Sequence, residues 1–410
     1  MLAQLCNLFK LRMAAPLPDV LQHNSSSQRV RRGLIALTSS PLVSVDGHLG
    51  EALHCILVKS EDWSRAADVS VEESLIAWYA HRVRDSKVDC PLSAQLYAEA
   101  LSEPKRAWTK HNATLTVDLL RSFTAQGIPA RVIKGQPLAQ AVYGDYLFRN
   151  SSDIDLVVPV RCVADATEHL RKQGFAPALS LHWFKDDRFL RLNKEASFVA
   201  LGGAFTVDLH WGLVNRWNAQ AVEQHELFES RGHTVQLMGQ VLPWFDPSLL
   251  FRIQLAHVIS SDFVGLKAWV DLAHVSDLLS SEDWAACASM CSKLGAERAL
   301  ALALMVLERV FNRPSPLPLS VADRTHLAPT VTEISAGLFT GRVPRPFSNS
   351  IKIALIVGGV RTAWRALSQA WKPAMIDFEH VDATTGTTTL VWQMIIRRTR
   401  KHLFTTKAQR

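Results

Sequence analysis

The sequence predicts an α+β fold in which a small sheet-containing core lies between two helical regions. Short β-rich runs alternate with helical segments in the middle of the chain, which is typical of a unit that packs helices on a sheet. Before and after this part, apolar residues recur at helical spacing. With 48% hydrophobic and 20% charged residues, the composition is that of a globular protein, which excludes a coiled coil and a wholly disordered chain.

The 410 residues suffice for two or three domains, and the local composition divides them into five segments. A Pro/Ser/Asn-rich and then basic stretch predicts a disordered leader over 1–32. We expect a helical region over 33–127, the α/β core over 128–246 and a second helical region over 247–382. A basic segment, 383–410, ends the sequence.

Positive charge is concentrated at the two ends of the sequence. Residues 1–32 carry a net +4 and residues 383–410 a net +6, so the body between them carries −3 of the total +7. A nucleic-acid groove needs positive charge on the folded body to neutralise phosphates. The distribution therefore favours solvated tails, and any nucleic-acid contact is expected from the basic C-terminal segment alone.

Cysteine usage and hydropathy favour a cytoplasmic protein. None of the six cysteines forms a CxxC pair, and no clear signal peptide precedes them, so free thiols in a reducing compartment are expected. Cys287 and Cys291 lie one helical turn apart with no nearby histidine, which predicts buried core thiols. No apolar run reaches the ~18 uncharged residues that span a bilayer.

Several elements of the core and its flanks can be located from periodicity and turn residues. Ser281 is expected as the N-cap of a late helix. In chain order the other elements are helix 105–126, strand 129–133, helix 136–144, strand 153–159, helix 161–173, a polar hairpin region 180–200 and strand 205–211.

The strongest chemical signal is the pair Asp153 and Asp155 in the run Asp-Ile-Asp-Leu-Val-Val. Residues i and i+2 of a strand point to the same side, so the two carboxylates face together while Ile154 and Leu156 face a core. Two carboxylates at one strand end repel each other unless a cation lies between them, and Mg²⁺ takes carboxylate oxygens together with substrate phosphates. A solvated strand face remains the alternative.

A third acid, Asp208, lies between apolar neighbours in the strand 205–211. A lone Asp in such a strand is costly to bury without a partner. Beside the other two acids it would complete a two-metal site, and it could accept a proton from an attacking hydroxyl. The alternative is an edge strand with Asp208 facing water.

Positive and flexible residues precede the acidic strand. Gly135 allows a close backbone approach to a phosphate, and Lys134 supplies a positive charge there. Arg149 could clamp phosphate oxygens, and its alternative is a structural ion pair with Asp145 or Asp153.

Histidines and further acids near these strands have less specific interpretations. His210 shares the strand face of the third acid and could reach the site, whereas His182 is expected to be structural, on a neighbouring strand. For His257, Asp271 and Asp283, buried polar contacts or helix capping are expected.

Taken together, these residues resemble the DNA polymerase beta-like nucleotidyltransferase superfamily, and within it the branch called uncharacterised nucleotidyltransferases. The branch has an LKG…L…Y…R…DIDLLV…DLHW pattern. The resemblance covers about residues 70–310 and is carried by Ile133-Lys-Gly-Gln-Pro-Leu-Ala139, Tyr143, Arg149-Asn-Ser-Ser-Asp-Ile-Asp-Leu-Val-Val158 and Val207-Asp-Leu-His-Trp211.

This resemblance implies a small mixed sheet with flanking helices and a Mg²⁺-dependent transfer of a nucleotidyl group from an NTP. Asp153 and Asp155 would bind two metal ions, and Asp208 would be a metal ligand and the base. Lys134 and Gly135 would lie at the phosphates.

The sequence departs from the superfamily where the usual Gly-Ser turn has Gln136 after Gly135. Ser151 or Ser152 could replace the missing serine as a phosphate contact. The acceptor is open: a small molecule, a sugar phosphate or a peptide. An inert nucleotide-binding scaffold and an RNA-modifying enzyme are the alternatives.

Overall fold

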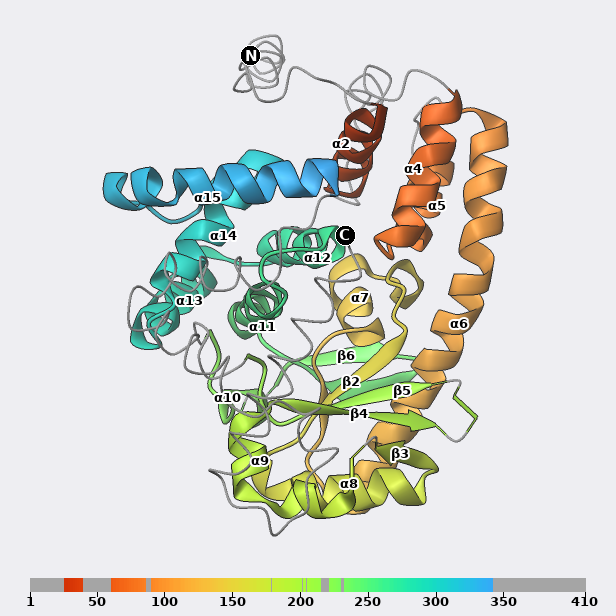
Figure 1. Cartoon of the computed structure of the whole chain (residues 1–410), viewed down its shortest axis with the longest axis vertical. Helices are drawn as coiled ribbons and strands as arrows, with labels where there is room; N and C mark the ends of the chain where they lie inside the picture. The colour runs from red at the N-terminus through yellow and green to blue at the C-terminus, as the bar shows by residue number, and fades with distance from the viewer. Residues whose placement is uncertain are drawn as a thin grey trace, which may run out of the picture.

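The computed structural model describes most of the chain between residues 26 and 341. A five-stranded sheet lies at the centre, with helices on both of its faces (Figure 1). The α+β class is therefore confirmed. The described ranges are 26–39, 60–85, 90–177, 179–200, 202–203, 205–214, 221–229 and 232–341.

The central sheet is mixed, with strand order β1-β2-β5-β4-β3. β2 and β5 pair in parallel, and every other pair in this sheet is antiparallel. The strands are β1 (Arg131–Val132), β2 (Asp153–Val157), β3 (Phe175–Pro177), β4 (Glu195–Ala200) and β5 (Thr206–His210).

One face of the sheet is apolar because alternate residues of each strand point to the same side. Leu156, Phe198 and Leu209 on this face are fully buried. They pack in one hydrophobic cluster with α8 (Val163–Lys172) and the C-terminal part of α6 (Leu92–Ala125). Figure 1 shows α8 beneath the sheet and α6 running along its side.

The second face carries the acidic residues and is covered by α7 (Gln136–Tyr143) and α11 (Pro247–Ser260). Asp246 caps α11 by accepting a hydrogen bond from the Leu249 amide, and Pro247 occupies its first turn, which favours a helix start there. Nearly all of α11 is buried, so this helix forms a rigid wall opposite the polar face.

Helices from the two flanking regions share one hydrophobic core rather than forming separate ones. For example, Leu34 and Trp63 belong to the same buried cluster as Trp269. These helices are α2 (Ser26–Ser39), α4 (Ser60–Glu72), α5 (Ile76–Asp85), α12 (Leu266–Ser276), α13 (Ser281–Lys293), α14 (Glu297–Phe311) and α15 (Val321–Thr340).

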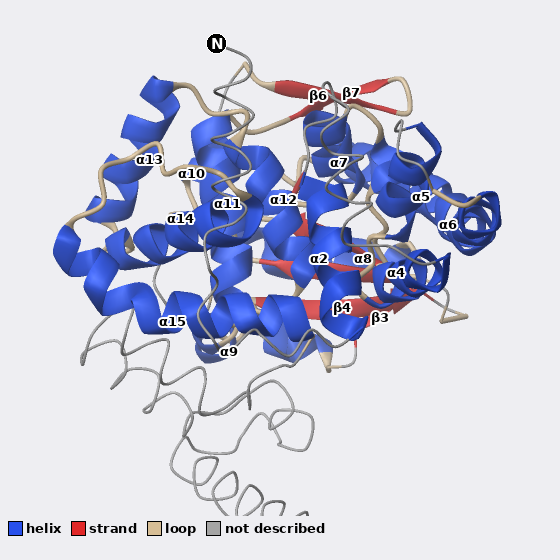
Figure 2. Ribbon diagram, turned by 90° about the horizontal axis from the view of Figure 1, so that it is seen from above, coloured by secondary structure: helices blue, strands red, loops and turns tan. Residues whose placement is uncertain are grey.

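Small elements complete the described structure. The hairpin of β6 and β7 packs beside α7, as Figure 2 also shows. These elements are η2 (Tyr146–Phe148), η3 (Val160–Cys162), η4 (Leu181–Lys185), α9 (Asp187–Leu192), α10 (Glu226–Glu229), β6 (Thr234–Leu237) and β7 (Gln240–Pro243).

Several expectations from the sequence need correction. The region 180–200 is not a hairpin, because η4 and α9 precede the single strand β4. Ser280 rather than Ser281 caps α13, where it exchanges hydrogen bonds with Asp283 in a capping box. The long helix α6 begins at Leu92, well before the expected residue 105, and continues through Pro104.

The expected leader over 1–32 overlaps α2, which begins at Ser26. Val30 is buried in the shared core and Arg31 pairs with Glu73 at 2.6 Å, so residues 26–32 are part of the fold. The rest of the leader and the basic segment 383–410 lie outside the described residues, and the five-segment division stays a prediction.

Two further expectations concern cysteines and membranes. Cys287 and Cys291 are free and buried, as predicted, and Cys162 is also free. Among the described helices, none combines the length and the apolar character that crossing a bilayer requires.

We predict that Phe198→Ala lowers the free energy of unfolding by about 3–5 kcal/mol, because it leaves a cavity beside Phe184 in the core beneath the sheet. Urea denaturation followed by circular dichroism measures this loss. The control is Val199→Ala on the opposite face of the same strand, where the side chain is 41% exposed. Equal losses for the two variants would contradict the assignment of faces.

Candidate active site

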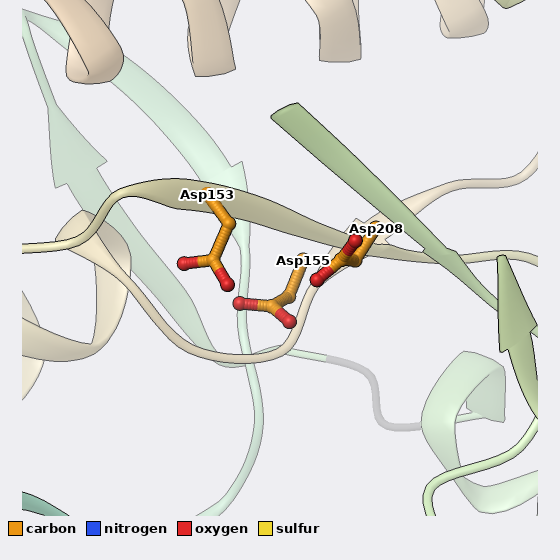
Figure 3. A group of neighbouring side chains, drawn as sticks. All are labelled: Asp153, Asp155 and Asp208. Atoms are coloured by element: carbon orange, nitrogen blue, oxygen red, sulfur yellow. The ribbon is translucent and has the colours of Figure 1, made fainter. Parts of the chain in front are cut away.

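Asp153, Asp155 and Asp208 converge on the polar face of the sheet. Parallel pairing of β2 with β5 sets Asp155 directly opposite Asp208 and Asp153 opposite Thr206. One carboxylate oxygen from each of the three acids lies within 4.8 Å of the others. Figure 3 shows the three side chains extending to the same side from the two neighbouring strands. The arrangement could hold a metal ion.

Asp155 is the most enclosed of the three acids, with 2% of its surface exposed. Its Oδ1 accepts from Lys134 Nζ and from His210 Nε2, each at 3.0 Å. Burial alone would raise the pKa of Asp155, but the His210 hydrogen bond and the Lys134 charge outweigh it and hold the pKa well below its ordinary value. Asp155 Oδ2 has no partner among the described residues, so one oxygen of this carboxylate is free for a ligand.

His210 connects the acidic strand to β4. Its Nε2 faces Asp155, and its Nδ1 lies 3.0 Å from Glu195 Oε2. Burial opposes the imidazolium, but the two carboxylates overcome it and raise the pKa of His210 to about 9. Glu195 was missed in the sequence because its strand was read as a hairpin, although the pairing Glu195 to His210 places both on one face.

Asp208 is half-buried and accepts a hydrogen bond from Ser197 Oγ at 2.6 Å. Burial raises the pKa of Asp208 above its ordinary value, and the negative charges of Asp155 and Asp153 raise it further. The hydrogen bond from Ser197 lowers the pKa but does not cancel these effects. The hydroxyl therefore orients a carboxylate whose proton affinity is increased. Ser197 is a second residue that the sequence did not single out.

The loop before β2 holds Asp153 in place. Ser151 Oγ lies 2.9 Å from both the carbonyl and the Oδ1 of Asp153. Asn112 on α6 donates to the Ser151 carbonyl at 2.8 Å, which ties the loop to the long helix. Ser151 thus contacts an acid of the cluster, whereas Ser152 is exposed.

The turn after β1 places Lys134 and Gly135 at the start of α7. Gly135 has φ +79° and ψ −142°, a conformation that favours glycine over residues with a Cβ. Burial opposes the Lys134 ammonium, but the charges of Asp155 and Asp153 outweigh it and raise the pKa of Lys134 above its ordinary value. The lysine is thus a fixed cation within the acidic cluster.

Arg149 has a partner that neither sequence interpretation named. Its Nε donates to Asp271 Oδ2 on α12 at 2.8 Å, and Tyr143 donates to the other oxygen of Asp271 at 2.7 Å. Arg149 and Asp271 are both almost fully buried. Asp145 instead accepts a hydrogen bond from the Leu147 amide. Of the two interpretations, the structure supports the structural ion pair, but the expected partners, Asp145 or Asp153, were wrong: Arg149 pairs with Asp271 from α12.

Lys267, also on α12, donates from its ammonium to the Asn150 carbonyl. Burial lowers the pKa of Lys267 to about 7, and the nearby Arg149 contributes. The side chains of Lys267 and Asp271 therefore attach α12 to the loop that precedes Asp153, through the Asn150 carbonyl and the Arg149 guanidinium.

The remaining residues of interest divide between the site and the surface. His257 lies on α11 and lines a pocket between that helix and the polar face of the sheet. His182 is exposed on η4 and contacts Trp183, so the expectation that it lies on a strand was wrong. The structural roles expected of Asp271 and Asp283 are confirmed by their ion pair and capping box.

The mixed sheet gathers three carboxylates beside a fixed lysine, an arrangement that could bind a metal ion together with a phosphate group. The chain is a nucleotidyltransferase. It belongs to the family described as uncharacterised nucleotidyltransferase, whose model matches residues 59–312, a range that contains every residue of this site. No curated protein and no solved structure matches the chain.

We predict that Asp271→Asn lowers the free energy of unfolding by about 3–5 kcal/mol, because it leaves the buried Arg149 guanidinium without its counter-charge. Chemical denaturation of the purified protein measures the effect. The matched control is Asp277→Asn, whose partner Arg313 is paired near the surface, where a loss of at most about 1 kcal/mol is expected. If both variants lose the same stability, the buried pair does not anchor the loop.

We also predict a pH dependence that originates at Lys267. Between about 7 and 10.5 the folded lysine is neutral while the unfolded one is charged. The unfolded state then binds more protons, so stability rises with pH. The unfolding free energy of the wild type relative to Lys267→Met should rise across this window by at most about 1.4 kcal/mol per pH unit. The control is Lys293→Met, at an exposed lysine of α13, whose unfolding free energy should change with pH as that of the wild type does. If the difference in unfolding free energy between the wild type and Lys267→Met does not change with pH, the prediction is wrong.

Proposed function

We propose that this protein is a Mg²⁺-dependent nucleotidyltransferase with a polymerase-beta-like core, which moves a nucleoside monophosphate from an NTP to an acceptor and releases pyrophosphate. The observation that carries the proposal is the meeting of Asp153, Asp155 and Asp208 within 4.8 Å. Membership of the family supports nucleotidyl transfer. The acceptor group is a hydroxyl or a phosphate oxygen.

The donor set suits a hard divalent cation. All three groups are carboxylates, and Asp155 Oδ2 is buried without a partner, as expected of an atom that coordinates a ligand in the working enzyme. Asp153, Asp155 and Asp208 would hold the metal ions. When bound, Mg²⁺ neutralises charge on the phosphates and favours departure of pyrophosphate.

Asp208 is the proposed base. Its raised pKa increases its affinity for a proton, and Ser197 fixes the orientation of its carboxylate. The acceptor hydroxyl attacks the α-phosphorus, so that a new P–O bond forms while the bond to the pyrophosphate oxygen breaks. The hydroxyl proton passes to Asp208, and the leaving electron pair remains on pyrophosphate.

Lys134 and the amide of Gly135 are proposed to face the triphosphate. Lys134 is already fixed beside Asp155, so it can neutralise phosphate charge without reorganising. Ser152 is exposed directly before β2 and is proposed as an additional phosphate contact. His210 is proposed to orient Asp155 rather than to bind the nucleotide, because both of its nitrogens face carboxylates.

Arg149 is proposed to fix the loop that precedes β2 rather than to bind phosphate. Its guanidinium is buried against Asp271, and this pair fixes the loop that precedes β2. A clamp would require the guanidinium to leave a carboxylate in an enclosed site, which is costly.

Calorimetric titration of ATP, GTP, CTP and UTP, each with and without Mg²⁺, tests the proposal. We predict Mg²⁺-dependent binding of at least one NTP by the wild type. Asp153→Asn and Asp155→Asn should weaken it at least tenfold, because each removes a metal ligand. Asp208→Asn should lower pyrophosphate release by roughly 10²–10⁴-fold through loss of the base.

Asp118→Asn is the control, since this aspartate lies on α6 with 61% of its side chain exposed. Circular dichroism melts of every variant separate loss of the site from loss of the fold. If the wild type neither binds an NTP nor releases pyrophosphate, the proposal is wrong, and a catalytically inert scaffold with this fold becomes the better interpretation.

A further inference from the structure

A pocket of about 170 Å³ opens between the polar face of the sheet and α11. Asp155 and Asp208 form one wall, whereas Asp153 and Gly135 do not line it. The pocket therefore extends from the acid cluster toward the C-terminal ends of β2 and β5, and it shares Lys134 with the proposed triphosphate position. A molecule bound here would approach the α-phosphorus from the side of Asp208, where the attacking hydroxyl must lie.

Gln254 is the unexplained residue of this pocket. It lies on α11, lines the pocket and is only 1% exposed. Neither its amide nitrogen nor its amide oxygen has a hydrogen-bond partner among the described residues. Burying an unpaired amide costs free energy. The Gln254 amide therefore offers one donor and one acceptor to a ligand, since no described protein group bonds to either.

The charges of the pocket favour an uncharged ligand. Its lysines, Lys134 and Lys194, are already paired with Asp155 at 3.0 Å and Glu195 at 3.1 Å. Its third cation, His210, lies 3.0 Å from each of the same two carboxylates. His257, opposite them on α11, is neutral, because burial together with the charges of Lys134 and Arg149 lowers its pKa to about 3. An anionic acceptor would therefore have to compete for these cations with their carboxylate partners and, at Lys134, with the phosphates of the proposed NTP.

The size of the pocket restricts the ligand further. A cavity of roughly 150 Å³ holds one six-membered ring, so about 170 Å³ suits a single sugar-sized ring. An oligonucleotide or a folded protein surface would have to present one small group to enter it.

We propose that this pocket is the acceptor site and that the acceptor is a small, uncharged polyhydroxylated molecule about the size of one sugar ring. Gln254 is the specificity-determining residue: its amide donates to one hydroxyl of the acceptor and accepts from a neighbouring one. This arrangement directs another hydroxyl toward Asp208. The inference rests on the proposed nucleotidyl transfer, but binding in the pocket does not require an NTP.

The test uses a panel of neutral hexoses, pentoses and inositol, with glucose 6-phosphate and glucosamine as charged counterparts. Saturation-transfer NMR without NTP measures binding to the full-length protein, and pyrophosphate release with Mg²⁺ and each NTP measures turnover. We expect a neutral member of the panel to bind and to stimulate release more than either charged sugar. Gln254→Leu should weaken its binding about tenfold through lost hydrogen bonds, with NTP affinity unchanged.

Gln236→Leu, at an exposed position of β6, is the matched control and should leave probe binding unchanged. Preference for a charged sugar, no binding by any neutral probe, or equal binding by wild type and Gln254→Leu would each overturn the inference. The last result would mean that Gln254 holds only solvent. Calorimetry with the NTPs separates these outcomes from failure of the proposed function, because it reports the nucleotide site alone. Loss of NTP affinity in Gln254→Leu would place this residue in the nucleotide site and would also reject the assignment.

Discussion

Electrostatic repulsion among three carboxylates is the constraint on which the rest of the site depends. The parallel register of β2 and β5 brings their oxygens within 4.8 Å, and like charges at such separations disfavour ionisation. Neighbouring elements offset this repulsion with positive charges and hydrogen-bond donors. Lys134 comes from the turn after β1, His210 from β5, and the hydroxyls of Ser151 and Ser197 from the loop before β2 and from β4.

These interactions affect the acids unequally: the pKa of Asp155 is depressed, while that of Asp208 is raised by burial and the neighbouring charges. Two adjacent acids are thereby suited to different tasks, one to remain ionised and one to take up a proton.

The buried pair of Arg149 and Asp271 extends this organisation from the sheet to the C-terminal helices. It fixes the loop before Asp153 against α12, and Tyr143 joins the pair from α7. Because this ion pair connects the loop before β2 with a helix more than 120 residues later, the position of the acidic strand depends on helices outside the sheet. The family match, which continues to residue 312, includes α12.

The sequence predicted the local features of the core well, because strand alternation and the spacing of the acids are short-range properties. Asp153 and Asp155 had to share a face because they are two residues apart in one strand. A small sheet allows few strand orders, and in some of these the strand of Asp208 lies beside theirs. The partner of Arg149 could not be predicted in this way, because Asp271 lies 122 residues away and only tertiary packing joins them. Glu195 and Ser197 were missed for a related reason. Their strand follows two short helical elements, whose polar, aromatic-containing sequence gave no clear period, so the register that aligns them with His210 and Asp208 was hidden.

Several of the buried polar atoms that have no partner among the described residues belong to the acid cluster or to the segments directly before it. Besides Asp155 Oδ2, the side-chain atoms without partners among the described residues include Gln136 Nε2, Arg149 Nη1 and Asn150 Oδ1. Gln136, which follows Gly135 at the turn before α7, is only 1% exposed. Each such atom loses the hydrogen bond that it would make to water in the unfolded chain. Preorganised donors and acceptors of this kind need no rearrangement when a charged ligand arrives. At this enclosed turn, the Gln136 amide nitrogen is one such donor.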